Sequence, residues 1–149
     1  MEQDYHHISV LLEESVAALD IKPNGVYVDC TFGGGGHSRA ILSQLGKHGK
    51  LIAFDHDKDA WENAIDDPRF ILVKEIFQYI KRFLSLLGTQ RVDGILADLG
   101  VSSFQFDTAD RGFSIRFDAP LDMRMDDRLD KTAADVIRDY SADQLQKMF

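Results

Sequence analysis

The sequence has 149 residues, of which 44% are hydrophobic, a formal net charge of −8 and a single cysteine. This length and apolar content suit one globular domain with a buried core. It contains no run of about 18 apolar residues that would cross a membrane, and its first residues lack the pattern of a secretion signal. One cysteine excludes a disulfide framework and a multi-cysteine metal site. We therefore expect a soluble, cytoplasmic protein.

The acidic balance argues against an extensive nucleic-acid surface, because phosphate contacts need Lys and Arg. The charge is distributed unevenly along the chain. Acidic residues crowd the segment 55–67, whereas arginine recurs at positions 111, 116, 124 and 128. Only this later segment is predicted to face phosphates.

Short apolar segments alternate with stretches of helical spacing over the first hundred residues. In chain order, the pattern predicts a helix over Leu12–Leu19, a strand over Val26–Cys30, a helix over Ser38–Leu45, a strand over Lys50–Phe54, a helix over Lys58–Ile65, a strand over Phe70–Val73, a helix over Phe77–Leu87 and a strand over Val92–Ala97. Strands that alternate with helices indicate an α/β fold with a parallel sheet covered on both faces.

The pattern changes after Asp98. Roughly thirty residues up to Arg128 show no clear period, and a loop of this length in a compact domain is usually functional. Beyond it, Thr132 with Asp135 and Ser141 with Gln144 predict capping boxes that begin two further helices.

Four consecutive glycines, Gly33–Gly36, lie between a predicted strand and a predicted helix. Glycine lets the backbone approach a ligand closely, so this loop predicts a nucleotide-like cofactor. Ligands of open parallel sheets bind beyond the carboxyl ends of the strands, where Asp29, Asp55 and Asp98 are expected. The alternative for Asp29 and Asp98 is that they only cap loops.

Asp55 follows the second strand, where a carboxylate accepts hydrogen bonds from both hydroxyls of an adenosine ribose. NAD and S-adenosylmethionine share this ribose. Ser38 stands where the NAD fingerprint has its third glycine, which disfavours NAD, and the loop lacks the lysine of an ATP-binding Walker motif. The glycines, Asp55 and an apolar Phe77 suit S-adenosylmethionine, although an aromatic residue on a helix is more often part of the core.

Two further candidates are weak. Cys30 at a strand end is expected to pack rather than to act as a nucleophile. His7 and His37 have no third convergent ligand in the sequence, so we predict no metal site.

Five segments of the chain are distinctive: His7–Leu12, Tyr27–Ser38, Asp93–Ser103, Arg111–Ser114 and Pro120–Met125. Together they resemble the bacterial ribosomal RNA small subunit methyltransferase H family. The last three are far more specific than a glycine-rich loop. Next to them, Phe104 replaces the proline usual before the glutamine and Ala119 replaces a glycine before Pro120. In the second segment, Cys30 replaces a glycine after Asp29.

The resemblance implies a Rossmann-like class I methyltransferase fold. Because family members are about twice as long as this chain, it implies a partial cofactor-binding core of about four strands over residues 1–128 and the start of a helical insertion over residues 129–149. It places cofactor contacts on Gly35, Gly36, His37, Asp55, Phe77, Asp98 and Gln105. His37 and Gln105 come from the resemblance alone, and otherwise they would be a helix-start residue and a solvated loop residue.

The implied reaction transfers a methyl group from S-adenosylmethionine to the exocyclic N4 amine of a cytidine in 16S ribosomal RNA of the small ribosomal subunit. The catalytic residues stay unassigned. Asp98 is a candidate acceptor for the amine hydrogens, Ser102 and Ser103 for base contacts, and Arg111 and Arg124 for the RNA backbone. Two alternatives remain open: a cofactor-binding fragment without turnover, and an NAD-dependent oxidoreductase.

Overall fold

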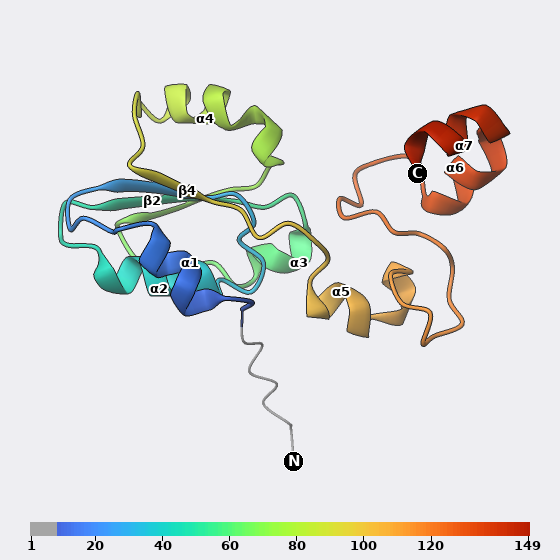
Figure 1. Ribbon diagram of the computed structural model, residues 1–149, viewed down its shortest axis with the longest axis horizontal. Helices are drawn as coiled ribbons and strands as arrows, with labels where there is room; N and C mark the ends of the chain where they lie inside the picture. Colours follow the sequence, from blue (N-terminus) through green and yellow to red (C-terminus); the bar gives the residue numbers. More distant parts are fainter. Residues whose placement is uncertain (1–8) are drawn as a thin grey trace, which may run out of the picture. The chain divides into compact units, whose positions relative to one another are not determined.

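The computed structural model describes residues 9–149, which divide into two compact units (Figure 1), one ending at Leu99 and one running from Gly100 to Phe149. The first unit contains α1 (Leu12–Ala18), β1 (Val26–Asp29), α2 (Gly36–Gln44), β2 (Lys50–Phe54), α3 (Lys58–Trp61), β3 (Phe70–Val73), the 3-10 helix η1 (Phe77–Tyr79), α4 (Ile80–Leu86) and β4 (Gly94–Leu96). The second contains α5 (Ser103–Asp107), the 3-10 helix η2 (Ala109–Arg111), α6 (Ala133–Asp139) and α7 (Ala142–Met148).

The strands of the first unit form one parallel sheet in the order β3-β2-β1-β4, which confirms the predicted α/β class. In register, Val28 of β1 lies opposite Ile52 of β2 on one side and Ile95 of β4 on the other. This order is that of the first four strands of a Rossmann fold. The strand order reverses between β1 and β4, and ligands of such sheets bind at that reversal, beyond the carboxyl ends of the strands.

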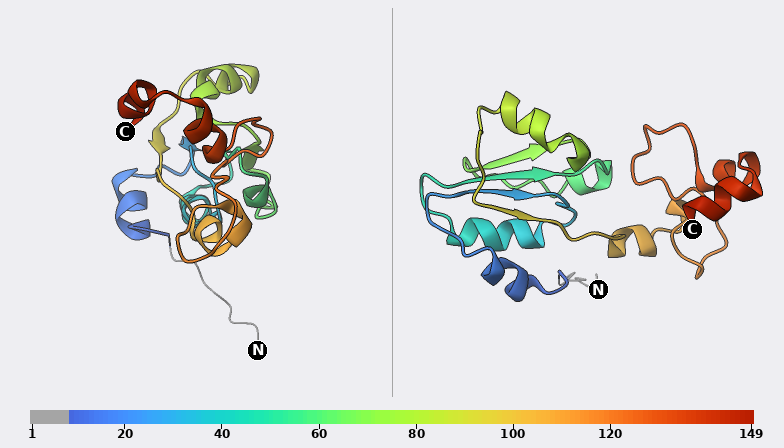
Figure 2. Two further views of the ribbon diagram at one scale, coloured as in Figure 1. Left: turned by 90° about the vertical axis from the view of Figure 1, so that its right-hand side faces the viewer. Right: turned by 45° about the horizontal axis from the view of Figure 1, so that its top comes forward.

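Helices cover both faces of the sheet, as Figures 1 and 2 show. Successive strand residues point to opposite faces, so the apolar strands supply two core layers. Tyr27 and Leu51 are fully buried on the face covered by α1 and α2. Val28 and Ile52 are fully buried on the opposite face, which α4 covers. Both layers hold β1 at the centre of the sheet, which fixes the position of its carboxyl end.

Several predicted boundaries differ from the observed ones. Strands β2 and β3 have the predicted bounds, whereas β4 is shorter than predicted and α2 begins at Gly36 rather than Ser38. The largest difference is α3, which ends at Trp61 instead of Ile65. Beyond it, the amides of Asn63 and Ala64 donate to carbonyls three residues earlier, so the chain tightens into turns before the Asp66-Asp67-Pro68 break.

The predicted long loop after Asp98 contains two short helices, α5 and η2, so the prediction was wrong for residues 103–111. Residues 112–128 have no helix or strand, as predicted. The hydroxyl oxygen of Ser102 accepts from the amide of Gln105, and the side chain of Gln105 accepts from the amide of Ser102. Capping boxes of the same type correctly predicted the starts of α6 and α7. Within residues 9–149, no helix is long and apolar enough to cross a membrane.

Candidate functional site

The ends of β1 and β4 are fixed to one another where the strand order reverses. The amide of Asp98, which follows β4, donates to Oγ1 of Thr31 at 2.8 Å, and the amide of Cys30 donates to the carbonyl of Leu96 at 2.8 Å. The Gly33–Gly36 segment, called the glycine loop below, follows β1 directly. The candidate site therefore begins from a rigid edge of the sheet.

The glycine loop has a shape that side chains would disturb. Gly33 and Gly35 have φ values of 51° and 78°, which L-residues rarely adopt. A Cβ added at Gly33 or Gly34 would meet no described atom within 4 Å, so open space lies above both residues. The amides of Gly34 and Gly36 donate to no acceptor within residues 9–149. The loop thus presents free N–H groups at the start of α2, where polar or anionic ligand atoms are favoured.

Asp55, at the end of β2, lies against the same loop. Its Oδ2 accepts from the amide of Gly33 at 2.8 Å, and its Oδ1 accepts from the amide of Asp57 at 2.9 Å. Burial raises the pKa of Asp55, although both amide donors act in the opposite direction. Each carboxylate oxygen has a further lone pair, so Asp55 is able to accept hydrogen bonds from two neighbouring hydroxyl groups.

His37, which follows the glycine loop, lies near Asp98. His37 is 5% exposed, and its Nδ1 lies 4.0 Å from Oδ2 of the half-exposed Asp98 carboxylate. Its buried Nε2 has no hydrogen-bond partner among the described residues. A buried polar atom without a partner costs about 1–3 kcal/mol, so this nitrogen is a natural contact for a ligand.

Asp29 has a different role from Asp98. It has no exposed surface, and its two oxygens accept from the amide of Thr31 at 3.0 Å and the hydroxyl of Ser38 at 2.7 Å. Burial raises its pKa. The loop-capping alternative therefore fits Asp29. The neighbouring Cys30 is buried, and burial raises its pKa to about 11, which agrees with a packing role rather than a nucleophilic one.

The remaining predicted contacts lie on other elements. Phe77 begins η1, beyond β3, and is 36% exposed, so the core alternative was wrong. Gln105 lies on α5 in the second unit and is 6% exposed, so it is not a solvated loop residue. His7 lies outside the described residues. Within residues 9–149, no group of three or more His, Cys, Asp or Glu side chains is arranged to hold a metal ion.

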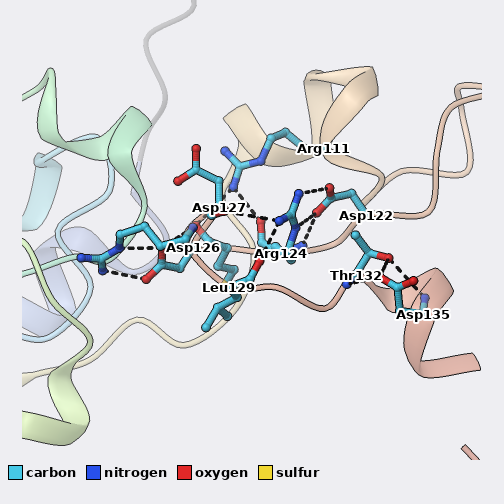
Figure 3. Close-up of polar contacts among 10 residues, drawn as sticks. Arg111, Asp122, Arg124, Asp126, Asp127, Leu129, Thr132 and Asp135 are labelled. Carbon is cyan, nitrogen blue, oxygen red and sulfur yellow. Dashed lines mark hydrogen bonds and ion pairs between the residues drawn. The ribbon is translucent and has the colours of Figure 1, made fainter. Parts of the chain in front are cut away.

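Arginines of the second unit hold its irregular backbone together (Figure 3). Nε and Nη2 of Arg124 donate to the carboxylate of Asp122 at 2.9 and 2.7 Å, and Nη1 donates to the carbonyl of Leu129 at 2.7 Å. Nη2 of Arg111 donates to the carbonyl of Arg124 at 3.1 Å, and Arg128 pairs with Asp126 at 2.6 Å. These contacts give the suggested phosphate-binding arginines a role inside the unit.

Sequence reasoning did not find Arg39 and Asn63, which contact the glycine loop from outside. Nη1 of Arg39 donates to the carbonyl of Gly34, and Nδ2 of Asn63 donates to the carbonyl of Gly33. The sequence did hold a signal for Arg39, because a residue one helical turn beyond the loop on α2 lies on the side of the helix near the loop. Asn63 had none, since the predicted helix ran past it.

The family was identified by comparison with known proteins. The model of the MraW methylase family matches residues 4–149. The chain belongs to the MraW methylase family. Two curated relatives are both called ribosomal RNA small subunit methyltransferase H. The protein from Flavobacterium psychrophilum is 60% identical over 139 residues, 93% of this chain and 48% of that protein. The one from Cytophaga hutchinsonii is 62% identical over 138 residues, 91% of this chain and 46% of that protein.

The chain therefore spans about half the length of the curated relatives it matches. Among solved structures, a Clostridium thermocellum protein aligns with 51% of this chain and 46% of its own, at 24% identity and a TM-score of 0.46. The family assignment accordingly rests on the sequence comparisons.

Proposed function

We propose that the chain binds S-adenosylmethionine and forms part of a methyltransferase that modifies the N4 amine of a cytidine in 16S ribosomal RNA. Membership of a methylase family implies this cofactor, and the curated relatives are called ribosomal RNA small subunit methyltransferase H. The observation that carries the proposal is the contact between the glycine loop and Asp55, 2.8 Å from the Gly33 amide to the carboxylate.

The residues present fit this cofactor. A ribose needs a carboxylate that accepts two hydroxyl hydrogens, and both oxygens of Asp55 retain a lone pair for them. A methionine carboxylate needs N–H donors, and those of Gly34 and Gly36 have no acceptor among the described residues. The unpartnered Nε2 of His37 adds a further polar contact. Phe77 and Gln105 are added to the proposed contacts on the family resemblance. The same resemblance supports assigning residues 1–128 to the cofactor-binding core and 129–149 to the start of a helical insertion.

The cofactor would supply an electrophilic methyl group. The amine of cytosine is a poor nucleophile, because its lone pair is delocalised into the ring, so positioning should contribute most of the rate. The half-exposed Asp98 carboxylate lies at the strand reversal and is the proposed acceptor for the amine hydrogens. His37, 4.0 Å from it, would limit the orientations of that carboxylate.

The RNA substrate is proposed from the relatives' names rather than from a basic surface. The target base must be unpaired or flipped, since a stacked amine cannot reach a cofactor at a sheet edge. The arginines at 111, 124 and 128 already bond within the second unit. We therefore expect this chain to contribute cofactor binding and base positioning more than phosphate contacts. A substrate in the small ribosomal subunit would place the protein in the cytoplasm.

Titration calorimetry with S-adenosylmethionine tests cofactor binding directly. The wild-type chain should bind, and Asp55→Ala should weaken binding at least about tenfold, because it removes a charge-assisted acceptor for two hydroxyls. Asp66→Ala is the matched control, since it removes the same charge from an exposed position. Equal affinity in wild type and Asp55→Ala would reject Asp55 as the ribose ligand. Titration with NADH in parallel tests the oxidoreductase alternative.

Methyl transfer is tested separately. Small ribosomal subunits that lack the modification are incubated with labelled cofactor and the chain, with the full-length Flavobacterium psychrophilum relative as the positive control. Appearance of N4-methylcytidine with the chain would establish turnover. Cofactor binding without product, while the control is active, would assign this chain to the binding fragment without turnover.

A further inference from the structure

The four carbonyl groups from Phe32 to Gly35 all accept hydrogen bonds. The carbonyl of Phe32 accepts from the amide of Gly35 at 2.8 Å, and that of Gly35 accepts from the amide of Arg39 at 2.9 Å. The two carbonyls between them accept from side chains, those of Asn63 and Arg39. A peptide group whose carbonyl is fixed also has its N–H direction fixed, because the two point in opposite directions across one plane.

Arg39 lies across the loop. Its Nη1 donates to the carbonyl of Gly34 at 2.7 Å. The same nitrogen would be only 2.5 Å from a Cβ added at Gly35, so the guanidinium packs directly on the glycine backbone. Its Nη2 donates to the carbonyl of Asn63 at 3.2 Å. Arg39 thus connects α2 to the turn that follows α3.

Asn63 completes the connection. Its Nδ2 donates to the carbonyl of Gly33 at 3.1 Å, while the amide of the same glycine donates to Asp55. Gly33 is therefore held at both ends of its backbone. This contact exists because α3 ends at Trp61, which places Asn63 in the following turn rather than on a helix.

We propose that Arg39 and Asn63, called the brace below, are positioning residues that hold the glycine loop in its ligand-binding shape before the cofactor binds. The inference rests on the proposed function and deepens it. By holding the carbonyl of Gly33, the brace fixes the direction of the Gly34 amide, which has no acceptor within residues 9–149. By holding the carbonyl of Gly34, it keeps the Gly35 amide in its bond to Phe32, and the backbone amide of Arg39 fixes the Gly36 amide through the carbonyl of Gly35. A ligand then meets donors that need no rearrangement. Its apparent affinity rises because a larger fraction of the molecules is already competent to bind.

The first experiment needs no cofactor. Amide hydrogen exchange is measured by NMR for wild type, Arg39→Ala and Asn63→Asp, the last of which keeps the side-chain shape but removes the donor. Exchange at Gly33 and Gly35 should accelerate about tenfold in both variants, because local opening no longer breaks the brace. Exchange at Val28 and Ile52 in the sheet should stay unchanged. Arg91→Ala, at an exposed position, controls for the lost positive charge.

The second experiment measures affinity for S-adenosylmethionine by titration calorimetry. Each brace variant should bind about tenfold more weakly, and the double variant should lose less than the product of the two single losses, because both side chains hold one loop. Arg39→Lys, which keeps a donor for the carbonyl of Gly34, should recover part of the affinity. If Arg39 and Asn63 had only a general structural role, their substitution would instead accelerate exchange throughout the sheet.

Unchanged exchange at Gly33 and Gly35 in both variants would overturn the proposal, and so would wild-type affinity in a variant whose loop exchanges faster. A wild-type chain that binds no cofactor would reject the proposed function instead. The exchange rates would then decide by themselves whether the brace holds the loop.

Discussion

The hydroxyl of Ser38 donates a 2.7 Å hydrogen bond to Oδ2 of Asp29, and neither residue exposes any surface. This contact joins the end of β1 to the first turn of α2 and closes the glycine loop at its base. Ser38 also occupies the position of the third glycine in an NAD fingerprint, where strand and helix must pack closely. The small serine side chain allows that close packing, and its hydrogen bond offsets part of the free energy that burial of the Asp29 carboxyl costs.

The stability cost of Asp29 should depend on pH. Burial raises its pKa in the folded chain, so the folded state holds this proton more tightly than the unfolded state. The stabilisation of the folded state by this bound proton is complete below the ordinary carboxyl pKa of about 4. It is lost as pH rises through the raised pKa of the folded state. In Asp29→Asn the side chain stays neutral. The free energy of unfolding of this variant, measured with urea, should therefore increase relative to that of wild type as pH rises. A pH-independent difference would contradict this.

Two neighbouring glycines should respond differently to alanine. Gly33→Ala forces a side chain into φ 51°, which should cost about 1 kcal/mol of stability. Gly34→Ala meets no described atom and has no positive φ, so its stability should stay within about 0.5 kcal/mol of wild type. Its methyl group would nevertheless occupy the space proposed for the ligand. Urea unfolding together with calorimetry checks whether Gly34→Ala loses cofactor affinity while keeping its stability.

Much of the first unit could be predicted from the sequence, because short β-branched strands and turn residues are local signals. The bounds of β2 and β3 matched for that reason. The end of α3 could not, since Glu62 to Ile65 suit a helix, and the turn there is stabilised by hydrogen bonds to Arg39 and Gly33 that are distant in sequence. In the second unit, the Ser102–Gln105 capping box was a visible signal that the irregular surroundings obscured.

The candidate site shows the same division. The glycine loop, Asp55 and Asp98 were predicted from their places after strands, and the structure brings the first two into contact. The Nε2 of His37, which has no partner among residues 9–149, and the brace could not be predicted, because both depend on which groups already have partners. That depends on three-dimensional hydrogen bonding, which spacing along the chain does not encode.

Cys30 should be nearly inert in the folded chain. It is buried and its pKa is raised to about 11, so very little thiolate exists at neutral pH. Its reaction with iodoacetamide near pH 7.5 should be at least about a hundredfold slower than in urea, where an unfolded thiol titrates at about 8.5. The rate of mass increase gives the comparison. Rapid labelling of the native chain would show that the end of β1 opens readily.

Arg124 should stabilise the second unit locally. Its guanidinium connects the carboxylate of Asp122 to the carbonyl of Leu129, across a segment with little regular structure (Figure 3). Arg124→Ala should therefore make residues 111–132 several-fold more susceptible to limited proteolysis, because local opening governs cleavage. Arg116→Ala is the control, since its ion pair with Asp107 is well exposed and should contribute little. Equal cleavage of both variants would argue against this role.

The chain contains one tryptophan, Trp61, and its indole N–H donates to the carbonyl of Asp55 at 2.9 Å. The ammonium group of Lys74 lies 4.9 Å from the centre of the same ring. The single tryptophan therefore lies beside the proposed ribose ligand, within a polar environment that any shift of Asp55 would alter. When it is excited at wavelengths that tyrosine does not absorb, its fluorescence emission reports on that one point of the molecule without labelling, so occupancy of the site can be followed in real time.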